Sequence, residues 1–137
     1  MAEGFARRYG SDVLEASSAG FFPATIVQPL TKKVMQEKNI NIDDQYPKSL
    51  DSLDVSTFDL IVNMSGRKLP SRLPIEVWEW NVEDPIAKPE DVYLTVRDQI
   101  EMSVMRLILK LRQDANPAQR GPTARSPLRH PGQQAQK

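Results

Sequence analysis

The stretch from Phe58 to Met64, which reads FDLIVNM, limits the possible folds of this chain more than any other segment. Its centre is a continuous apolar run, Leu60-Ile61-Val62, without the polar alternation of a strand that has one face in water. Such runs are typical of strands in parallel sheets, where helices cover both faces. The segment therefore predicts a buried strand over 58–64 in a parallel sheet flanked by helices.

The remaining periodicities complete an α/β pattern. Apolar residues recur at helical spacing, with period three to four, in three segments, and shorter apolar stretches predict two more strands. The helices are expected at 1–9, 28–39 and 89–112, and the strands at 12–16 and 75–82. Helices that alternate with strands in this order are typical of an α/β fold with a largely parallel sheet.

Two other segments lead to predictions about individual side chains. Trp78 and Trp80 stand two residues apart on a predicted strand, so their side chains point to one face, and core packing is the expected role. The connection over 65–74 is rich in proline and basic residues, and we expect Arg67, Lys68 and Arg72 to be solvated there. One turn of helix in this connection is also compatible with its sequence.

Chain length and composition suggest one domain followed by a tail. Residues 1–112 form the expected domain, whereas 113–137 is a basic segment rich in proline and glutamine. Because the tail has almost no sizeable apolar side chain to bury, we expect it to be disordered. The chain has no cysteine, and its single histidine, His130, lies in the tail, where we expect it to be solvated.

Composition also excludes several classes of function. The absence of cysteine removes disulfides, thiolate metal sites and a thiol nucleophile, and no metal or cofactor is expected. A net charge of +0 gives little support for binding nucleic acid. No segment approaches the ~20 apolar residues of a membrane span, and no signal peptide is visible, so no membrane association and a cytoplasmic location are expected.

Five motifs, taken in order, resemble the low-molecular-weight protein-tyrosine phosphatases and their arsenate reductase relatives. They are MAEGFAR at 1–7, Ser18-Ala19-Gly20, the strand at 58–64, Glu83-Asp84-Pro85, and the helix through 92–111. The resemblance extends over residues 1 to about 112. It implies a flavodoxin-like parallel sheet flanked by helices, with strand order 2-1-3-4.

The resemblance also implies a chemistry. In this family a cysteine thiolate attacks the phosphorus of a phosphomonoester, and a carboxylic acid protonates the leaving oxygen. Asp84 matches that general acid, and Pro85 favours an extended conformation at Asp84. Ser18 matches the serine that supports the phosphate-binding loop. The implied partner is a phosphorylated protein, a small phosphomonoester or another oxyanion.

The resemblance places a strand and a Cys-x5-Arg-Ser loop immediately before the helix at 1–9, and this sequence contains neither. We therefore expect an N-terminally incomplete domain whose first strand is missing, with marginal stability and only background phosphatase activity. The favoured explanation is that Met1 is an internal methionine of a longer protein.

Three alternatives remain at this level. The chain could be a non-catalytic module that binds an anion or a partner strand, an unrelated flavodoxin-like binding domain, or a fragment of an enzyme with arsenate reductase activity. Residues 65–74 lack the cysteines that a thioredoxin-coupled reductase uses. Ile86 and Ala87 stand where the eukaryotic-type phosphatases tend to have tyrosines, which argues against a preference for phosphotyrosine.

Overall fold

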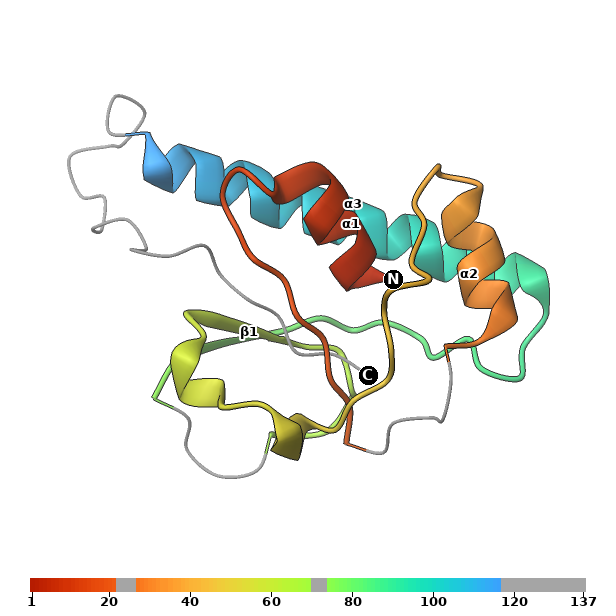
Figure 1. The fold of residues 1–137 in the computed structure, drawn as a ribbon, viewed down its shortest axis with the longest axis horizontal. Coiled ribbons are helices and arrows are strands. Elements are labelled where there is room, and N and C mark those ends of the chain that lie inside the picture. Colours follow the sequence, from red (N-terminus) through yellow and green to blue (C-terminus); the bar gives the residue numbers. More distant parts are fainter. Residues whose placement is uncertain (22–26, 70–73, 117–137) are drawn as a thin grey trace.

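The computed structural model describes residues 1–21, 27–69 and 74–116. Three α-helices and two strands make up the regular structure of these ranges (Figure 1). In chain order they are α1 (Ala2–Gly10), α2 (Pro29–Gln36), β1 (Leu60–Asn63), β2 (Glu76–Glu79) and α3 (Glu90–Ala115). Two short 3-10 helices, Leu50–Ser52 and Val55–Thr57, precede β1.

The strands β1 and β2 pair in parallel, with Leu60 opposite Glu76 and Asn63 opposite Glu79. The backbone N–H of Trp80 donates to the Asn63 carbonyl at 2.9 Å, which continues the pairing past β2. All four residues of β1 are buried, as the apolar run predicts. Trp78 and Trp80 pack against the main core, which confirms their expected role.

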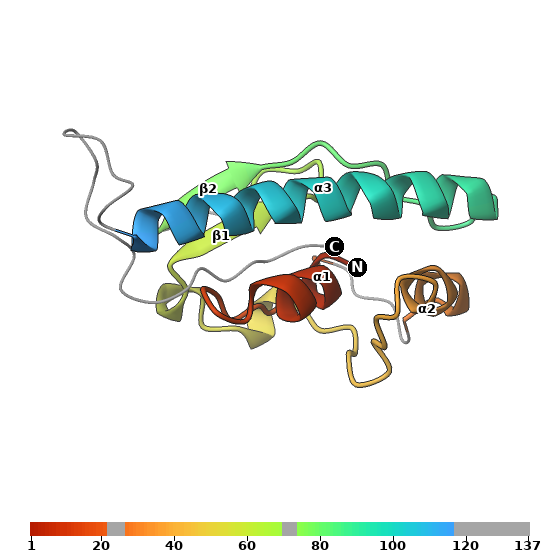
Figure 2. The same cartoon turned by 90° about the horizontal axis from the view of Figure 1, so that it is seen from above.

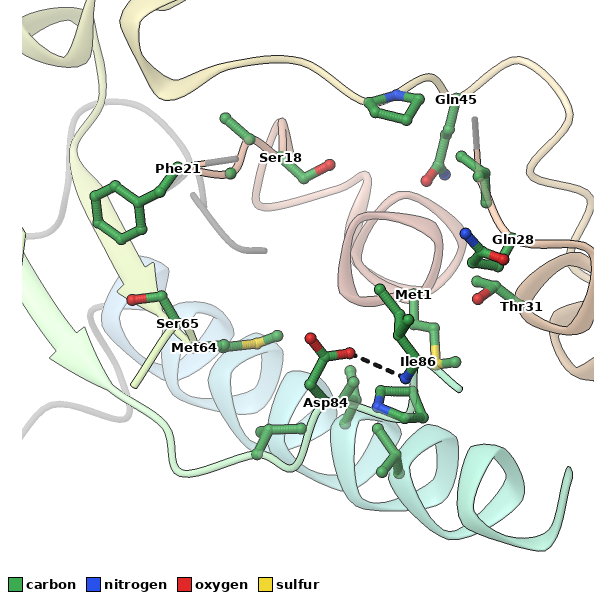
Figure 3. Close-up of a pocket in the computed structure, with 18 of the residues that line it drawn as sticks. Met1, Ser18, Phe21, Gln28, Thr31, Gln45, Met64, Ser65, Asp84 and Ile86 are labelled. Carbon is green, nitrogen blue, oxygen red and sulfur yellow. Dashed lines mark hydrogen bonds between the residues drawn. The ribbon is translucent and has the colours of Figure 1, made fainter. Parts of the chain in front are cut away.

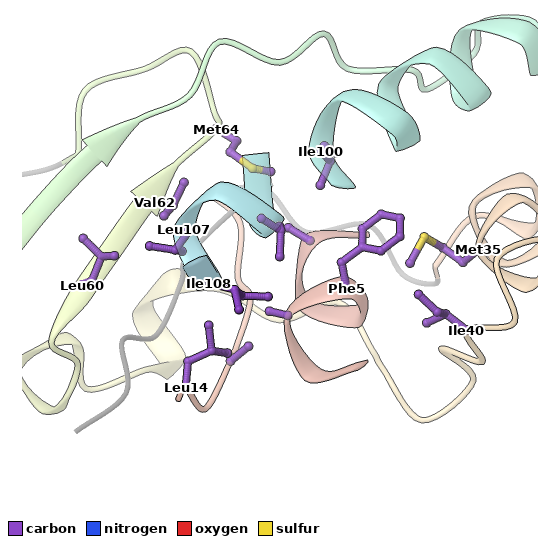
Figure 4. Close-up of a cluster of buried hydrophobic side chains, with 14 of the residues drawn as sticks. Phe5, Leu14, Met35, Ile40, Leu60, Val62, Met64, Ile100, Leu107 and Ile108 are labelled. Atoms are coloured by element: carbon purple, nitrogen blue, oxygen red, sulfur yellow. The ribbon is translucent and has the colours of Figure 1, made fainter. Parts of the chain in front are cut away.

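The helices α1 and α2 both pack along α3, and the strands lie on another side of α3 (Figure 2). Apolar side chains from all these layers meet in one core (Figure 4). Members that link the layers are Phe5, Met35, Leu60, Val62, Leu107 and Ile108. The α/β architecture with parallel strands flanked by helices is therefore confirmed.

Local signals in the sequence account for the ends of the helices. Pro29 occupies the first turn of α2, where its missing N–H costs nothing. Asn39 adopts a left-handed conformation, with φ 59°, and the N–H of Ile40 bonds back to the Met35 carbonyl at 3.1 Å. This arrangement closes the end of α2. Pro89 caps α3, and acidic residues follow in its first turn.

The strand expected at 12–16 is wrong. Ser11 to Val13 form a turn, and the chain from Leu14 to Ser18 has no regular secondary structure. Leu14 and Ala16 are nevertheless buried, so the apolar pattern correctly marked residues that face the core. A strand also needs a neighbour to pair with, and within the described ranges residues 12–16 make no strand pairing; the isolated bridge between Gly20 and Ser49 follows them.

The observed ends of two helices also differ from the expected ones. The helix expected at 28–39 is shorter, because turns replace it after Gln36. The last helix extends to Ala115, so residues 113–115, which were expected to belong to the disordered tail, are helical. Residues 117–137 and 70–73 lie outside the described residues, and in 65–69 there is no helical turn. No helix in the described ranges has the length and apolar character needed to cross a membrane.

Candidate functional site

A cavity of about 470 Å³ opens beside the start of α1. Its walls come from several parts of the chain: Met1 at the start of α1, the segment after α1, the start of α2, the loop around residues 45–48, the loops that follow β1 and β2, and one side of α3 (Figure 3). Polar side chains in the lining include Ser18, Lys48, Ser65, Arg67 and Asp84. The cavity is thus bordered by the loops that leave both strands of the sheet.

Asp84 lies in the loop between β2 and α3, and its carboxylate extends into the cavity (Figure 3). One carboxylate oxygen accepts a hydrogen bond from the backbone N–H of Ile86 at 3.1 Å. This contact spans Pro85 and holds the loop in a local turn. The other carboxylate oxygen has no hydrogen bond within the described residues and is available to a ligand.

Ser18 contacts α1. Its hydroxyl donates a hydrogen bond to Oε1 of Glu3 at 2.6 Å. Glu3 is only 2% exposed, although it is a carboxylate in the first turn of a surface helix. Two cations compensate it: Arg7 lies 3.0 Å from Oε2, and Lys48 lies 3.7 Å from Oε1. A buried carboxylate needs such partners, because desolvation of an unpaired charge is costly.

The loop after β1 is fixed by the buried side chain of Asn63. Its amide nitrogen donates to the Arg67 carbonyl at 2.6 Å, and its amide oxygen accepts from the Ser65 hydroxyl at 2.7 Å and from the Ser65 N–H at 3.0 Å. Gly66 allows this tight loop because it has a positive φ of 73°. The network brings Ser65 and Arg67 to the cavity.

Met1 also lines the cavity, and it carries the α-amino group of the chain. Burial lowers the pKa of this group to about 6, and the nearby Glu3 carboxylate opposes that shift. Within the described ranges, no group of three or more histidine, cysteine, aspartate or glutamate side chains has a geometry that could hold a metal ion.

The structure brings the two site residues expected from the sequence, Ser18 and Asp84, to one cavity, which Met1 also lines. Sequence analysis did not identify Glu3, Lys48 or Asn63. Glu3 resembles an ordinary acidic residue near a helix N-terminus, although its neighbours Ala2 and Phe5 already mark that turn as buried. Arg67 is exposed, as expected, but it contributes to the cavity wall.

Comparison of the sequence with known proteins gives a consistent result. The family model described as low molecular weight phosphotyrosine protein phosphatase matches residues 1–117. A glutaredoxin arsenate reductase from Synechocystis is 30% identical over 115 residues, which are 81% of this chain and 87% of that protein. Arsenate reductase 1 of Bacillus cereus is 32% identical over 104 residues, covering 73% of this chain and 77% of that protein.

Solved structures agree with the sequence comparison. An arsenate reductase in its phosphate-binding state superposes with a TM-score of 0.73 at 28% identity, over 80% of this chain and 86% of that one. The arsenate reductase of Archaeoglobus fulgidus gives a TM-score of 0.68 at 29% identity, over 78% and 86% of the two chains.

Proposed function

Because the chain belongs to the low molecular weight phosphotyrosine protein phosphatase family, we propose that its cavity is an oxyanion site of that family. Asp84 serves there as the general acid. The 137 residues contain no cysteine, so the chain alone does not turn over a phosphomonoester, and turnover needs a thiol supplied from outside this sequence. A phosphorylated protein or a small phosphomonoester is the proposed substrate class. The proposed location of the protein is the cytoplasm.

One observation supports this assignment above all: Asp84 and Ser18 line the same cavity as Met1, the residue that immediately precedes α1. The N-terminus of a helix directs unpaired backbone N–H groups outward and favours negative charge. An oxyanion held there would have a carboxylic acid on one wall and the Lys48 ammonium on another. A leaving oxygen could then take a proton from Asp84 as its bond to phosphorus breaks.

Phosphate and arsenate have similar shape and charge, and several relatives are named arsenate reductases. Reduction of arsenate by cysteine thiols needs residues that this chain lacks, so oxyanion reduction is not better supported than hydrolysis. Ile86, which is 53% exposed, borders the cavity in place of an aromatic side chain. The described lining does contain the aromatic residues Phe21 and Tyr46, so Ile86 alone argues against a preference for phosphotyrosine.

The first experiment measures p-nitrophenyl phosphate hydrolysis by the purified 137-residue chain and by Asp84→Asn. Both should be at background. Activity of the unmodified chain that disappears in Asp84→Asn would contradict the proposed need for an external thiol, because it would place the complete machinery within these residues.

A second experiment tests Asp84 directly. A strand and a Cys-x5-Arg-Ser loop, taken from an active relative, are fused before Met1, and hydrolysis is measured with and without Asp84→Asn. We expect the fusion to gain activity and Asp84→Asn to lower it by about 10²- to 10⁴-fold, the usual contribution of a general acid. Asp91→Asn, a change of an exposed aspartate in the first turn of α3, is the matched control. Equal loss in both variants would refute the role of Asp84.

A third experiment follows binding without turnover. Phosphate and arsenate are titrated into the isotope-labelled chain while amide chemical shifts are recorded. Shifts confined to residues 1–5 and to the lining around Ser18 would support an oxyanion site. Their absence with both anions would count against it, whatever the outcome of the activity assays.

A further inference from the structure

Three uncharged polar side chains gather on one side of the cavity. Gln28 and Thr31 come from the start of α2, and Gln45 comes from the loop between α2 and the first 3-10 helix. Figure 3 shows the three side chains together, with Ser65 on the opposite side of the cavity. We refer to Gln28, Thr31 and Gln45 as the Gln–Thr cluster.

The Gln–Thr cluster has hydrogen-bonding capacity that the described residues do not use. Its three members are only partly exposed, and none of their side chains makes a hydrogen bond with a described residue. In contrast, the hydroxyls of Ser18 and Ser65 in the same lining already donate to the side chains of Glu3 and Asn63. Because polar groups withdrawn from water are normally paired, the cluster is available to a ligand in the cavity.

We propose that the Gln–Thr cluster binds the hydroxyl groups of the substrate, and that the substrate is a small phosphomonoester of a sugar or another polyol. This polyol subsite rests on the proposed oxyanion site: the phosphate lies beside Asp84 and the start of α1, and the hydroxylated part reaches the cluster. A carboxamide offers two donors and an acceptor, and a hydroxyl both donates and accepts. Sugar hydroxyls have the same dual character, so they can satisfy all three side chains.

The surroundings of the cluster suit a neutral hydroxylated group. Val27 precedes Gln28 in the chain, and the backbone N–H of Gln45 donates to the Ile42 carbonyl at 3.0 Å. Both Val27 and Ile42 also line the cavity, so apolar side chains are available to the C–H groups of a sugar ring. Because the cluster itself carries no charge, it favours hydroxyls over a second anionic group.

The size of the cavity separates this substrate class from the alternatives. A volume of about 470 Å³ lies in the range of sites that enclose small ligands, ~300–1,000 Å³. Inorganic phosphate beside Asp84 would leave the cluster to water. A phenyl group would cover the cluster without offering it a hydrogen bond, which is unfavourable for the polar groups that lose water. A phosphoserine of a protein has a short side chain without hydroxyls to reach the cluster.

Binding to the purified 137-residue chain tests the proposal without any turnover. Inorganic phosphate, phenyl phosphate and glucose 6-phosphate are titrated separately, with calorimetry for the Kd and NMR for the contacts. Glucose 6-phosphate should bind roughly tenfold or more tightly than either of the other two, because a site built to bond hydroxyls rejects ligands that lack them. The side-chain NH₂ signals of Gln28 and Gln45 should shift with glucose 6-phosphate and stay in place with inorganic phosphate.

Near-isosteric variants remove the polar groups one at a time. Gln28→Met, Thr31→Val and Gln45→Met should each weaken glucose 6-phosphate binding by roughly threefold to tenfold and leave the Kd of inorganic phosphate unchanged. The matched control is Gln36→Met, since Gln36 is an exposed glutamine of α2 outside the cavity lining. Thermal melts check that each variant is folded, and the NH₂ signals of the parent give a readout that needs no variant.

The outcomes separate the polyol subsite from the oxyanion site. Phosphate that shifts residues 1–5, with glucose 6-phosphate binding no tighter than phenyl phosphate, would overturn the subsite and leave the oxyanion site standing. No shift at residues 1–5 with any of the three ligands would remove both. A phosphoserine peptide that binds as tightly as glucose 6-phosphate would also overturn the subsite, and so would equal weakening by Gln36→Met and the cluster variants.

Discussion

The Ser18 hydroxyl donates a 2.6 Å hydrogen bond to the carboxylate of Glu3, and this bond joins the segment after α1 to the first turn of that helix. The same carboxylate is paired with Arg7 and Lys48, so three chain segments meet at one buried charge. Because Met1 and Ser18 line the cavity, this cluster fixes the position of two of its walls. A direct contact of Ser18 with a phosphate-binding loop stays a prediction.

Ser18→Ala should lower the free energy of unfolding by about 1–3 kcal/mol, because the buried Glu3 carboxylate loses a charge-assisted hydrogen bond. Urea denaturation measures the change. Ser17→Ala is the matched control, since Ser17 is also half-buried and makes no hydrogen bond through its hydroxyl within the described residues. Equal destabilisation by the two changes would show that the Ser18 bond adds nothing.

Gly10→Ala should destabilise the protein although alanine favours helices. A Cβ atom at Gly10 of α1 would lie 2.8 Å from Cγ1 and 2.9 Å from Cδ1 of Ile108 in α3. Overpacking of this kind costs ~1–3 kcal/mol, more than the ~1 kcal/mol gained in helix propensity. A double-mutant cycle with Ile108→Ala measures the coupling. The loss caused by Ile108→Ala should be smaller in the Gly10→Ala background, and strictly additive losses would contradict the contact.

Arg97→Met should loosen the end of α2. The guanidinium of Arg97 is buried, with the residue 8% exposed, and it donates to the Val34 carbonyl at 2.9 Å and to Glu37 at 3.0 Å. Carbonyls in the last turn of a helix lack partners in the helix, so Arg97 supplies one from α3. The free energy of unfolding should fall by about 2–4 kcal/mol.

The control for this change is Arg106→Met on the exposed face of α3, which should stay within ~0.5 kcal/mol of the parent. Amide hydrogen exchange gives a second readout: α2 should exchange faster in Arg97→Met and at the parent rate in Arg106→Met. Unchanged exchange in α2 would exclude a role for Arg97 in holding that helix.

Asp12 and Arg112 connect the end of α1 to the end of α3. Arg112 donates to both oxygens of the Asp12 carboxylate at 2.9 and 3.0 Å, and these hydrogen bonds hold the pKa of Asp12 below its usual value of 3.8. A carboxyl group whose pKa falls on folding stabilises the folded state above its unfolded pKa. That contribution is lost as the pH drops through the lower, folded pKa.

Titration of the Asp12 carboxyl carbon by NMR should therefore give a pKa below the usual range in the parent and a higher value in Arg112→Gln. The stability difference between parent and Arg112→Gln should be present at neutral pH and shrink below about pH 4. Arg8→Gln, on the exposed side of α1, should leave the pKa of Asp12 unchanged. An Asp12 pKa that does not respond to Arg112→Gln would exclude the pair as its cause.

Much of the fold could be predicted from particular residues. The run Leu60-Ile61-Val62 marked β1, since only a strand covered on both faces can be apolar at consecutive positions. The repeat in 89–112 marked α3 for a similar reason. The segment 12–16 shows where this reasoning fails: the burial of Leu14 is visible in the sequence, whereas strand pairing depends on a neighbour elsewhere in the chain.

The candidate site was predictable only in part. Asp84 was marked by its motif and by Pro85, and Ser18 by its turn. Lys48 and Glu3 gave no local signal, because a buried ion pair is defined by which distant segments meet. Asn63 likewise gave no signal within an apolar strand, although three of its side-chain hydrogen bonds shape the loop that reaches the cavity.

The sequence by itself determined the class of fold, the family and the absence of a thiol, since periodicity, motif order and composition are properties of the chain alone. Tertiary structure decided that Asp84 and Ser18 line one cavity, that Glu3 is buried among cations, and that Arg97 of α3 reaches the Val34 carbonyl in α2. The physical reason is that burial and charge pairing are set by contacts between segments far apart in sequence, and only the folded chain fixes them.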